Sequence, residues 1–201
     1  MKMIKKMIIV IAGIVLAGIY SFNTWSASIY DTNIDSSTYA NVGELVGDAT
    51  VEQRFLCEQN GLESVEVVMS NPGNESDAVY HWSVREVQTD KVIGEGYFNV
   101  DEVVNAGKKL FSFEKQQESK SKEYIFAIDI VDSSSEHGIS VMKTAAGRGQ
   151  EEGLSLNGEQ EEEVLVLTQN IKYLNIETAI VFFGLYMYIV LFMTFLTKLF
   201  K

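Results

Sequence analysis

The chain has 201 residues and few of the residues that build disulfide, metal and nucleic-acid sites. A single cysteine excludes a disulfide framework, and with only two histidines it leaves no Cys/His zinc constellation. One proline excludes polyproline linkers and collagen-like character. Because 16 basic residues stand against 28 acidic ones, the chain lacks the basic surface of a nucleic-acid-binding protein. Hydrophobic residues nevertheless make up 46% of the chain, which excludes a disordered acidic protein.

The charges are unevenly distributed along the chain. All 28 acidic residues lie between Asp31 and Glu177, whereas five lysines lie outside this window, near the two ends. Eleven basic residues remain inside it, so the middle carries a formal charge of −17. Two uncharged apolar stretches, 7–22 and 178–197, separate the terminal lysines from this acidic middle.

Both apolar stretches are candidate membrane segments. The second has 20 residues, and at 1.5 Å per residue it spans about 30 Å, the thickness of a bilayer's hydrocarbon core. We therefore expect a C-terminal transmembrane helix at 176–197. The first stretch is compatible with a cleaved signal peptide or with an uncleaved anchor. Its only small residues at a suitable cleavage spacing are Ser26-Ala27-Ser28, next to Trp25, so we favour an N-terminal transmembrane anchor at 1–22.

The terminal lysines also predict an orientation. By the positive-inside rule, lysines at the outer ends of two spans place both termini in the cytoplasm. The middle domain is then extracytoplasmic, in a two-span protein of the cell membrane.

Most of the middle alternates apolar and polar residues with period two, and no run with helical period appears. Seven to nine short strands separated by turn signals are typical of a β-sandwich, so we predict an all-β domain at 50–170. The segment 23–49 is polar and poorly patterned, and we interpret it as a stalk. We expect a flexible stretch from Ala145 to Glu163.

The alternation also predicts which side chains form the core. Cys57 shares an inward face with Phe55, which indicates a buried, inert thiol. The aromatic residues expected to face inward are Tyr80, Trp82, Phe98, Phe111, Phe113, Tyr124 and Phe126.

Three short motifs carry a resemblance to a known family. They are Val51-Glu52-Gln53-Arg54-Phe55, Leu62-Glu63-Ser64-Val65-Glu66-Val67 and Lys120-Ser121-Lys122-Glu123-Tyr124-Ile125-Phe126. In this order the segment Thr50–Thr144 resembles an extracytoplasmic jelly-roll-like domain of bacterial membrane proteins linked to surface-polysaccharide synthesis. In those proteins the domain usually precedes a many-helix, glycosyltransferase-like membrane region. Since one apolar stretch follows it here, the resemblance implies a jelly-roll-like sandwich without the transferase part.

Candidate ligand-binding residues follow from the outward faces of the predicted strands. Aromatic side chains stack on sugar rings, and Tyr97 is the aromatic residue that points away from the core. His81 and Arg85 share the outward face of the strand that also carries Trp82. We take Tyr97, His81 and Arg85 as the candidate ligand-binding residues.

No pattern indicates catalysis or a cofactor. A Ser-His-Asp arrangement requires a geometry that spacing does not predict, and no pair of carboxylates is singled out for acid–base chemistry. The acidic run at 159–163 is interpreted as a solvated loop, with a calcium site as the alternative, although no EF-hand-like pattern is present. We expect no enzyme activity, no cofactor and no bound metal.

Within the first apolar stretch, Gly13, Ala17 and Ser21 repeat every four residues. Such a stripe of small side chains lets a second helix approach closely, so these residues form a candidate helix-packing face.

Two functions remain open at this point. The first is an accessory or binding component of cell-envelope polysaccharide assembly, anchored in the membrane and without catalytic activity. The alternative is a scaffold subunit that binds other membrane proteins through its sandwich and helices. The expected partners are the membrane and either a cell-surface glycan or membrane proteins, and not nucleic acid.

Overall fold

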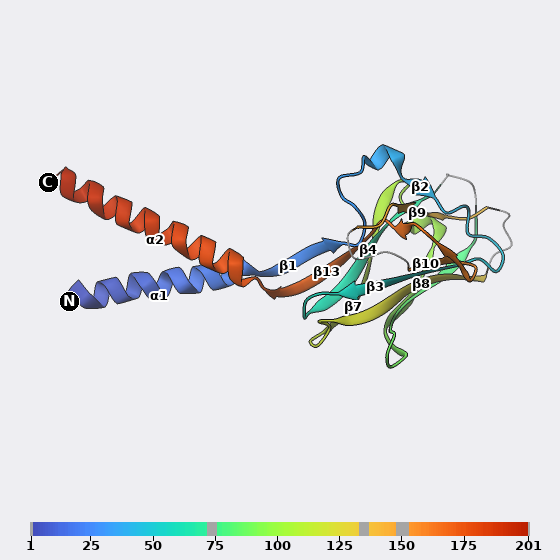
Figure 1. Cartoon of the computed structure of the whole chain (residues 1–201), viewed down its shortest axis with the longest axis horizontal. Coiled ribbons are helices and arrows are strands. Elements are labelled where there is room, and N and C mark those ends of the chain that lie inside the picture. Colours follow the sequence, from blue (N-terminus) through green and yellow to red (C-terminus); the bar gives the residue numbers. More distant parts are fainter. Residues whose placement is uncertain (1, 72–75, 133–136, 148–152, 201) are drawn as a thin grey trace. The chain divides into compact units, whose positions relative to one another are not determined.

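The computed structural model describes residues 2–71, 76–132, 137–147 and 153–200 (Figure 1). The chain divides into two compact units, Met1–Trp25 with Lys172–Lys201, and Ser26–Ile171. The elements are α1 (Lys2–Ser21), β1 (Phe22–Ser28), β2 (Ala40–Asn41), β3 (Thr50–Cys57), β4 (Leu62–Ser70), β5 (Val79–Glu86), β6 (Lys91–Asn99), β7 (Gly107–Gln116), β8 (Lys122–Asp132), β9 (Ser140–Thr144), β10 (Leu154–Leu156), β11 (Glu159–Glu161), β12 (Val164–Leu165), β13 (Leu167–Leu174) and α2 (Ile176–Leu199).

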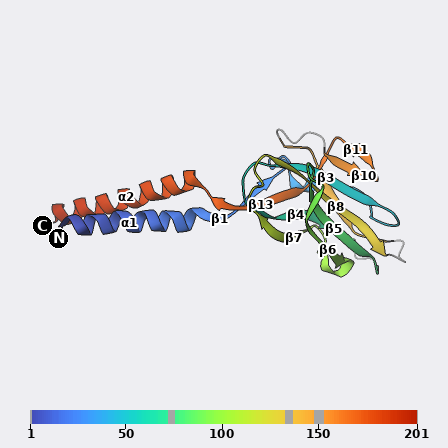
Figure 2. The ribbon, with the colours of Figure 1, turned by 90° about the horizontal axis from the view of Figure 1, so that it is seen from below.

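The strands form two antiparallel sheets, which confirms the predicted all-β sandwich. The seven-stranded sheet has the order β1-β13-β4-β9-β12, with β2 paired to β9 and β7 paired to β4. The six-stranded sheet has the order β11-β10-β3-β8-β5-β6. Its long strands β3, β8, β5 and β6 lie side by side in Figure 2. This second sheet carries the candidate site.

The core between the sheets is aromatic. Phe111 on β7 contacts Trp82, Phe98 and Phe126 from the opposite sheet, with ring centroids 5.0–5.6 Å apart. The inward faces expected for Tyr80, Trp82, Phe98, Phe111, Tyr124 and Phe126 are confirmed, since each is at most 9% exposed.

One aromatic residue of the expected core lies at its margin. Phe113 is only half-buried, and it packs against Gly94 of β6. A Cβ atom on Gly94 would lie 2.5 Å from the Cβ atom of Phe113, so this close approach depends on glycine.

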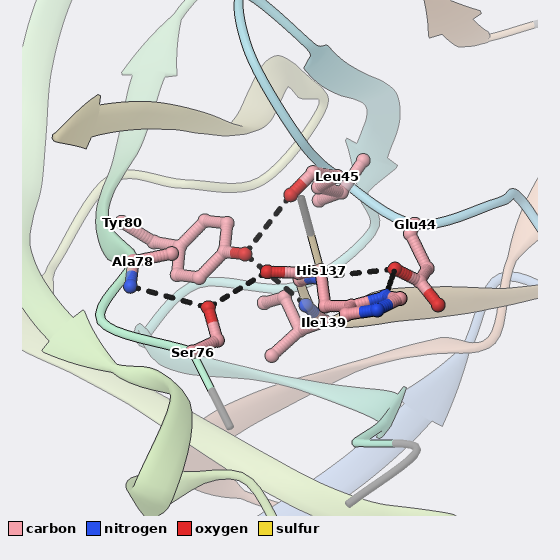
Figure 3. A network of polar contacts seen from close by, with 8 residues as sticks. Glu44, Leu45, Ser76, Ala78, Tyr80, His137 and Ile139 are labelled. Carbon is pink, nitrogen blue, oxygen red and sulfur yellow. Dashed lines mark hydrogen bonds and ion pairs between the residues drawn. The ribbon is translucent and has the colours of Figure 1, made fainter. Parts of the chain in front are cut away.

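The segment 23–49 is not a stalk, because much of it packs on the sandwich. Ile29 and Leu45 are buried, and β2 pairs with β9. Figure 3 shows the polar network that holds the Leu45 end. The Tyr80 hydroxyl donates to the Leu45 carbonyl oxygen at 3.0 Å and accepts the Ile139 amide at 3.1 Å. The pairing was missed because backbone atoms make it, and they leave no mark on the side-chain pattern.

Beside the hydrogen bonds of Tyr80, the Glu44 carboxylate accepts the Gly138 amide and pairs with the His137 imidazole, each at 3.2 Å (Figure 3). Ser76 donates to the His137 carbonyl oxygen at 2.7 Å. His137 therefore helps to attach the segment 40–45 to the sandwich.

The stretch 145–163, expected to be flexible, contains two strands in its described part. Both belong to the six-stranded sheet, where β10 pairs with β3 and β11 pairs with β10. Residues 148–152 lie outside the described part of the chain. In the acidic run, Glu161 and Glu163 accept hydrogen bonds from the Lys143 ammonium group at 2.9 and 2.7 Å. Glu163 and then Glu161 raise the pKa of Lys143.

The helical unit differs in part from the expectation of two membrane spans. Of the described helices, α2 alone is long and apolar enough to cross a membrane by length and composition, and it ends two residues beyond the predicted 197. The apolar part of α1, Lys6–Ser21, is shorter. Asn175 is the N-cap of α2, its side chain accepts the Thr178 amide, and Glu177 lies in the first turn of the helix.

Candidate functional site

The outer face of the six-stranded sheet brings together all three predicted ligand-binding residues. The register of four neighbouring strands arranges its outward side chains in rows. The rows, written from β3 through β8 and β5 to β6, are Thr50–Asp129–His81–Tyr97, Glu52–Ala127–Ser83–Glu95 and Arg54–Ile125–Arg85–Val92. The middle row has small side chains, Ala127 and Ser83, at its centre, so longer side chains from the outer rows can lie across it.

The aromatic corner of this face is formed by Tyr97 and His81. Tyr97 is 68% exposed although it lies on a regular strand. Its ring centroid is 5.2 Å from that of His81. The His81 imidazole lies between two carboxylates, with Nδ1 3.2 Å from Asp129 Oδ1 and Nε2 3.6 Å from Glu95 Oε2. These contacts hold the imidazole beside the tyrosine and leave the ring of Tyr97 open to solvent.

Arg85 of β5 forms hydrogen bonds with one carboxylate on β3 and with another in the turn before β6. Its Nη2 atom donates to Glu52 Oε1 at 3.0 Å and its Nη1 atom to Asp90 Oδ1 at 3.1 Å. The hydrogen bond to Asp90 and the charge of Glu52 raise the pKa of the Arg85 guanidinium. Partly exposed pairs of this kind contribute about 0–1 kcal/mol to stability, so their main effect is to fix the position of Arg85.

A pocket adjoins this ion pair on the β3 side of the face. Its volume is about 380 Å³. It is lined by Glu52, Arg54, Ile125, Gly153, Ser155 and Gln160, which come from β3, β8 and the β10–β11 region. Polar donors and acceptors therefore surround one apolar side chain, Ile125, so the lining suits a polar ligand that can hydrogen-bond to it.

Sequence reasoning missed the pocket residues, although part of the signal was present. Alternation places Glu52 and Arg54 opposite the buried Val51 and Phe55, so their outward direction was predictable. The antiparallel register of β3 with its two neighbours was not predictable from the sequence. It pairs residues about 70 positions apart between β3 and β8, and about 100 positions apart between β3 and β10.

The helix-packing stripe lies on the side of α1 that faces α2. Gly13, Ala17 and Ser21 are buried in the helical unit. A Cβ atom on Gly13 would lie 2.6 Å from ring atoms of Tyr186, whose hydroxyl donates to the Ile9 carbonyl oxygen at 3.1 Å. Tyr20 stacks on Phe182 with ring centroids 4.6 Å apart. The two helices are therefore antiparallel neighbours, and the small residues of α1 admit the aromatic residues of α2.

The cysteine thiol lies in the interior of the sandwich unit. Cys57 is fully buried, its thiol donates to the Gln59 carbonyl oxygen at 3.1 Å, and burial raises its pKa. A raised pKa disfavours the thiolate that a nucleophile requires. Within the described ranges, no three His, Cys, Asp or Glu side chains are grouped so that they could hold a metal ion.

Comparison with known proteins assigns no family. No protein-family model matches the chain, and no curated protein matches it. Among solved structures, the chain is similar to a structure of infectious bursal disease virus, Gx strain, with 10% sequence identity and a TM-score of 0.31. The match covers 75% of this chain, which spans 36% of the viral chain. A likeness at this level carries no argument about fold or function.

Proposed function

We propose that this protein is a membrane-anchored, extracytoplasmic glycan-binding component of cell-envelope polysaccharide assembly that has no catalytic activity. In this account the outer face of the six-stranded sheet is the binding surface, with Tyr97, His81 and Arg85 as its ligand-binding residues. No cofactor or metal takes part.

The observation that carries the proposal is the exposed tyrosine on the outer face of the six-stranded sheet. Tyr97 presents its ring to solvent at 68% exposure, with His81 beside it. An aromatic ring offers an apolar face to the C–H surface of a sugar, and the tyrosine hydroxyl remains available for a hydrogen bond. Asp129 is paired with His81 and Glu52 with Arg85, so these side chains offer preorganised partners for sugar hydroxyls.

The link to polysaccharide assembly is supported by the resemblance of Thr50–Thr144 to extracytoplasmic domains of polysaccharide-associated membrane proteins. The thiol of Cys57, buried and with a raised pKa, is unsuited to act as a nucleophile. A scaffold role is less well supported, because the small-residue stripe that a partner helix would use is already occupied by α2.

The same proposal includes a two-span topology with both termini in the cytoplasm. The helix α1 has 20 residues, and at 1.5 Å per residue it reaches about 30 Å. Since α1 and α2 are antiparallel neighbours, the lysines at the start of α1 lie at the same end of the pair as Lys198. Lysines gathered at one end support a single cytoplasmic side.

The binding experiment uses the full chain in lipid nanodiscs on an array of bacterial envelope polysaccharide fragments. We expect binding to a subset of glycans and at least a tenfold loss with Tyr97→Ala. Leu110→Ala is the matched control, because Leu110 is 54% exposed on the seven-stranded sheet. Absence of binding, or equal binding by the Tyr97 variant, would contradict the proposal.

The topology is tested separately with epitope tags at both ends of the chain. Protease added to intact spheroplasts should digest the sandwich and spare both tags. Digestion of the N-terminal tag would rule out the two-span orientation, and its loss from the membrane fraction would indicate cleavage after α1.

A further inference from the structure

The pocket beside β3 differs from the rest of the outer face in its charge. Arg54 is exposed at its edge, and within the described residues no carboxylate pairs with its guanidinium. The carboxylate of Glu52, which also lines the pocket, is already paired with Arg85 at 3.0 Å. The pocket therefore offers one positive charge that its own lining does not neutralise.

The other lining residues add donors and shape. Ser155 contributes a hydroxyl and Gln160 a side-chain amide, and these two residues face each other across β10 and β11. Gly153 approaches β3 so closely that a Cβ atom there would lie 2.7 Å from the Arg54 carbonyl oxygen. A guanidinium with neighbouring hydroxyl and amide donors is well suited to an oxyanion, because its paired N–H groups match two oxygens at once.

The position of the pocket relative to Tyr97 indicates the size of the ligand. Arg54 and Tyr97 lie three strands apart and two rows apart. With strands about 4.8 Å apart and a rise of about 3.3 Å per residue, their Cα atoms are separated by about 20 Å along the sheet diagonal. A single sugar ring does not bridge this distance, whereas a chain of several linked sugars does.

We propose that the pocket is a subsite for an anionic substituent, a carboxylate or a phosphate, on a glycan chain that lies diagonally across the face from Tyr97. This inference rests on the proposed function and adds the class of glycan and its direction on the sheet.

The acidic character of the sandwich does not oppose this assignment. Repulsion between exposed charges is largely screened beyond about 8 Å at physiological ionic strength. The charged groups close to the pocket therefore determine whether it attracts an anion. Of the charged side chains that line the pocket, Glu52 is paired with Arg85 at 3.0 Å, and Arg54 is the cationic one.

The test uses three soluble probes on the full chain in nanodiscs. They are a β-linked glucuronate oligosaccharide, the same oligosaccharide with its carboxyl groups reduced to alcohols, and a phosphodiester-linked glycan. Arg54→Gln removes the charge and keeps hydrogen-bonding ability. Lys91→Gln, an exposed cation at the start of β6, removes the same charge outside the pocket. Circular dichroism of both variants verifies that the sandwich is folded.

We expect at least one anionic probe to bind tenfold or more tightly than the reduced oligosaccharide. Arg54→Gln should abolish that preference without weakening the reduced probe, and Lys91→Gln should preserve it. The anionic probe that loses affinity identifies carboxylate or phosphate as the preferred group. If the reduced oligosaccharide binds as well as the anionic probes, or if Arg54→Gln leaves the preference intact, this inference is wrong while the glycan-binding function stands. If no probe binds, this inference is wrong, and the glycan array decides the glycan-binding function separately.

Discussion

The hydroxyl group of Tyr80 makes two buried hydrogen bonds to backbone groups of the sandwich unit. It lies between two backbone groups that would otherwise pair with each other, donating to the Leu45 carbonyl oxygen and accepting the Ile139 amide. Leu45 and Ile139 make one direct bond, from the Leu45 amide to the Ile139 carbonyl oxygen at 2.7 Å. The tyrosine hydroxyl thus replaces the second bond of an antiparallel pair.

Replacing Tyr80 by phenylalanine removes this oxygen and keeps the ring. The side chain is 0% exposed, so the Ile139 amide and the Leu45 carbonyl lose their partner inside the protein. Each buried polar group left without a hydrogen bond costs about 1–3 kcal/mol. Because the loop can relax and restore part of one bond, we expect a loss of about 2–4 kcal/mol in the free energy of unfolding, at constant m-value.

The measurement is urea unfolding of the full chain in detergent micelles. The background carries Trp25→Phe, so that the buried Trp82 is the single fluorescent reporter. Tyr97→Phe is the control, since it removes the same atom from an exposed side chain and should change stability by less than about 0.5 kcal/mol. If Tyr80→Phe costs no more than Tyr97→Phe, the hydroxyl does not hold the segment 40–45 on the sandwich.

Three further predictions concern the core, a capping carboxylate and the helix pair. Trp82→Ala should lower the free energy of unfolding by about 3–5 kcal/mol, seen as a lower Tm by circular dichroism, and an unchanged Tm would refute its core position. The Asn99 amide and then Lys109 lower the pKa of Glu102 below its ordinary 4.5, so the stability that it contributes is present above pH 4.5 and is lost as the pH falls. The loss of stability on acidification, followed by urea midpoints, should be smaller in Glu102→Gln, and equal losses would exclude this contribution. Gly13→Ile should separate the helices and broaden the distance distribution between spin labels near the two termini, whereas Gly18→Ile, with no atom within 4 Å of its Cβ position, should not. Identical distributions for the two variants would mean that Gly13 is not a packing position.

The faces of the long strands were predictable from the sequence because alternation depends only on which side of a sheet is buried. Trp82 and Val84 illustrate this, since each is flanked by polar residues and each lies in the core. The outward residues of β5 and β6 follow by the same argument. A hairpin then places His81 and Tyr97 side by side, so part of the candidate site could be predicted.

The remaining features depend on long-range pairing that no local pattern encodes. The segment 23–49 is held by backbone bonds and by Tyr80, and its polar sequence resembles that of an exposed linker. The strands β10 and β11 are three residues each, too short for a period to be recognised. Because they form one wall of the pocket, the Arg54 subsite could not be predicted without the sheet order.

The central claim is that the outer face of the six-stranded sheet binds a glycan. Hydroxyl-radical footprinting with mass spectrometry tests it most directly, with the full chain in nanodiscs and size-fractionated envelope polysaccharide as the ligand. Tyr97 and Leu110 are exposed on opposite outer faces, at 68% and 54%, and both are oxidised readily when free. The account predicts that the polysaccharide protects Tyr97 and leaves Leu110 unprotected. Protection of Leu110 with unchanged oxidation of Tyr97 would contradict it.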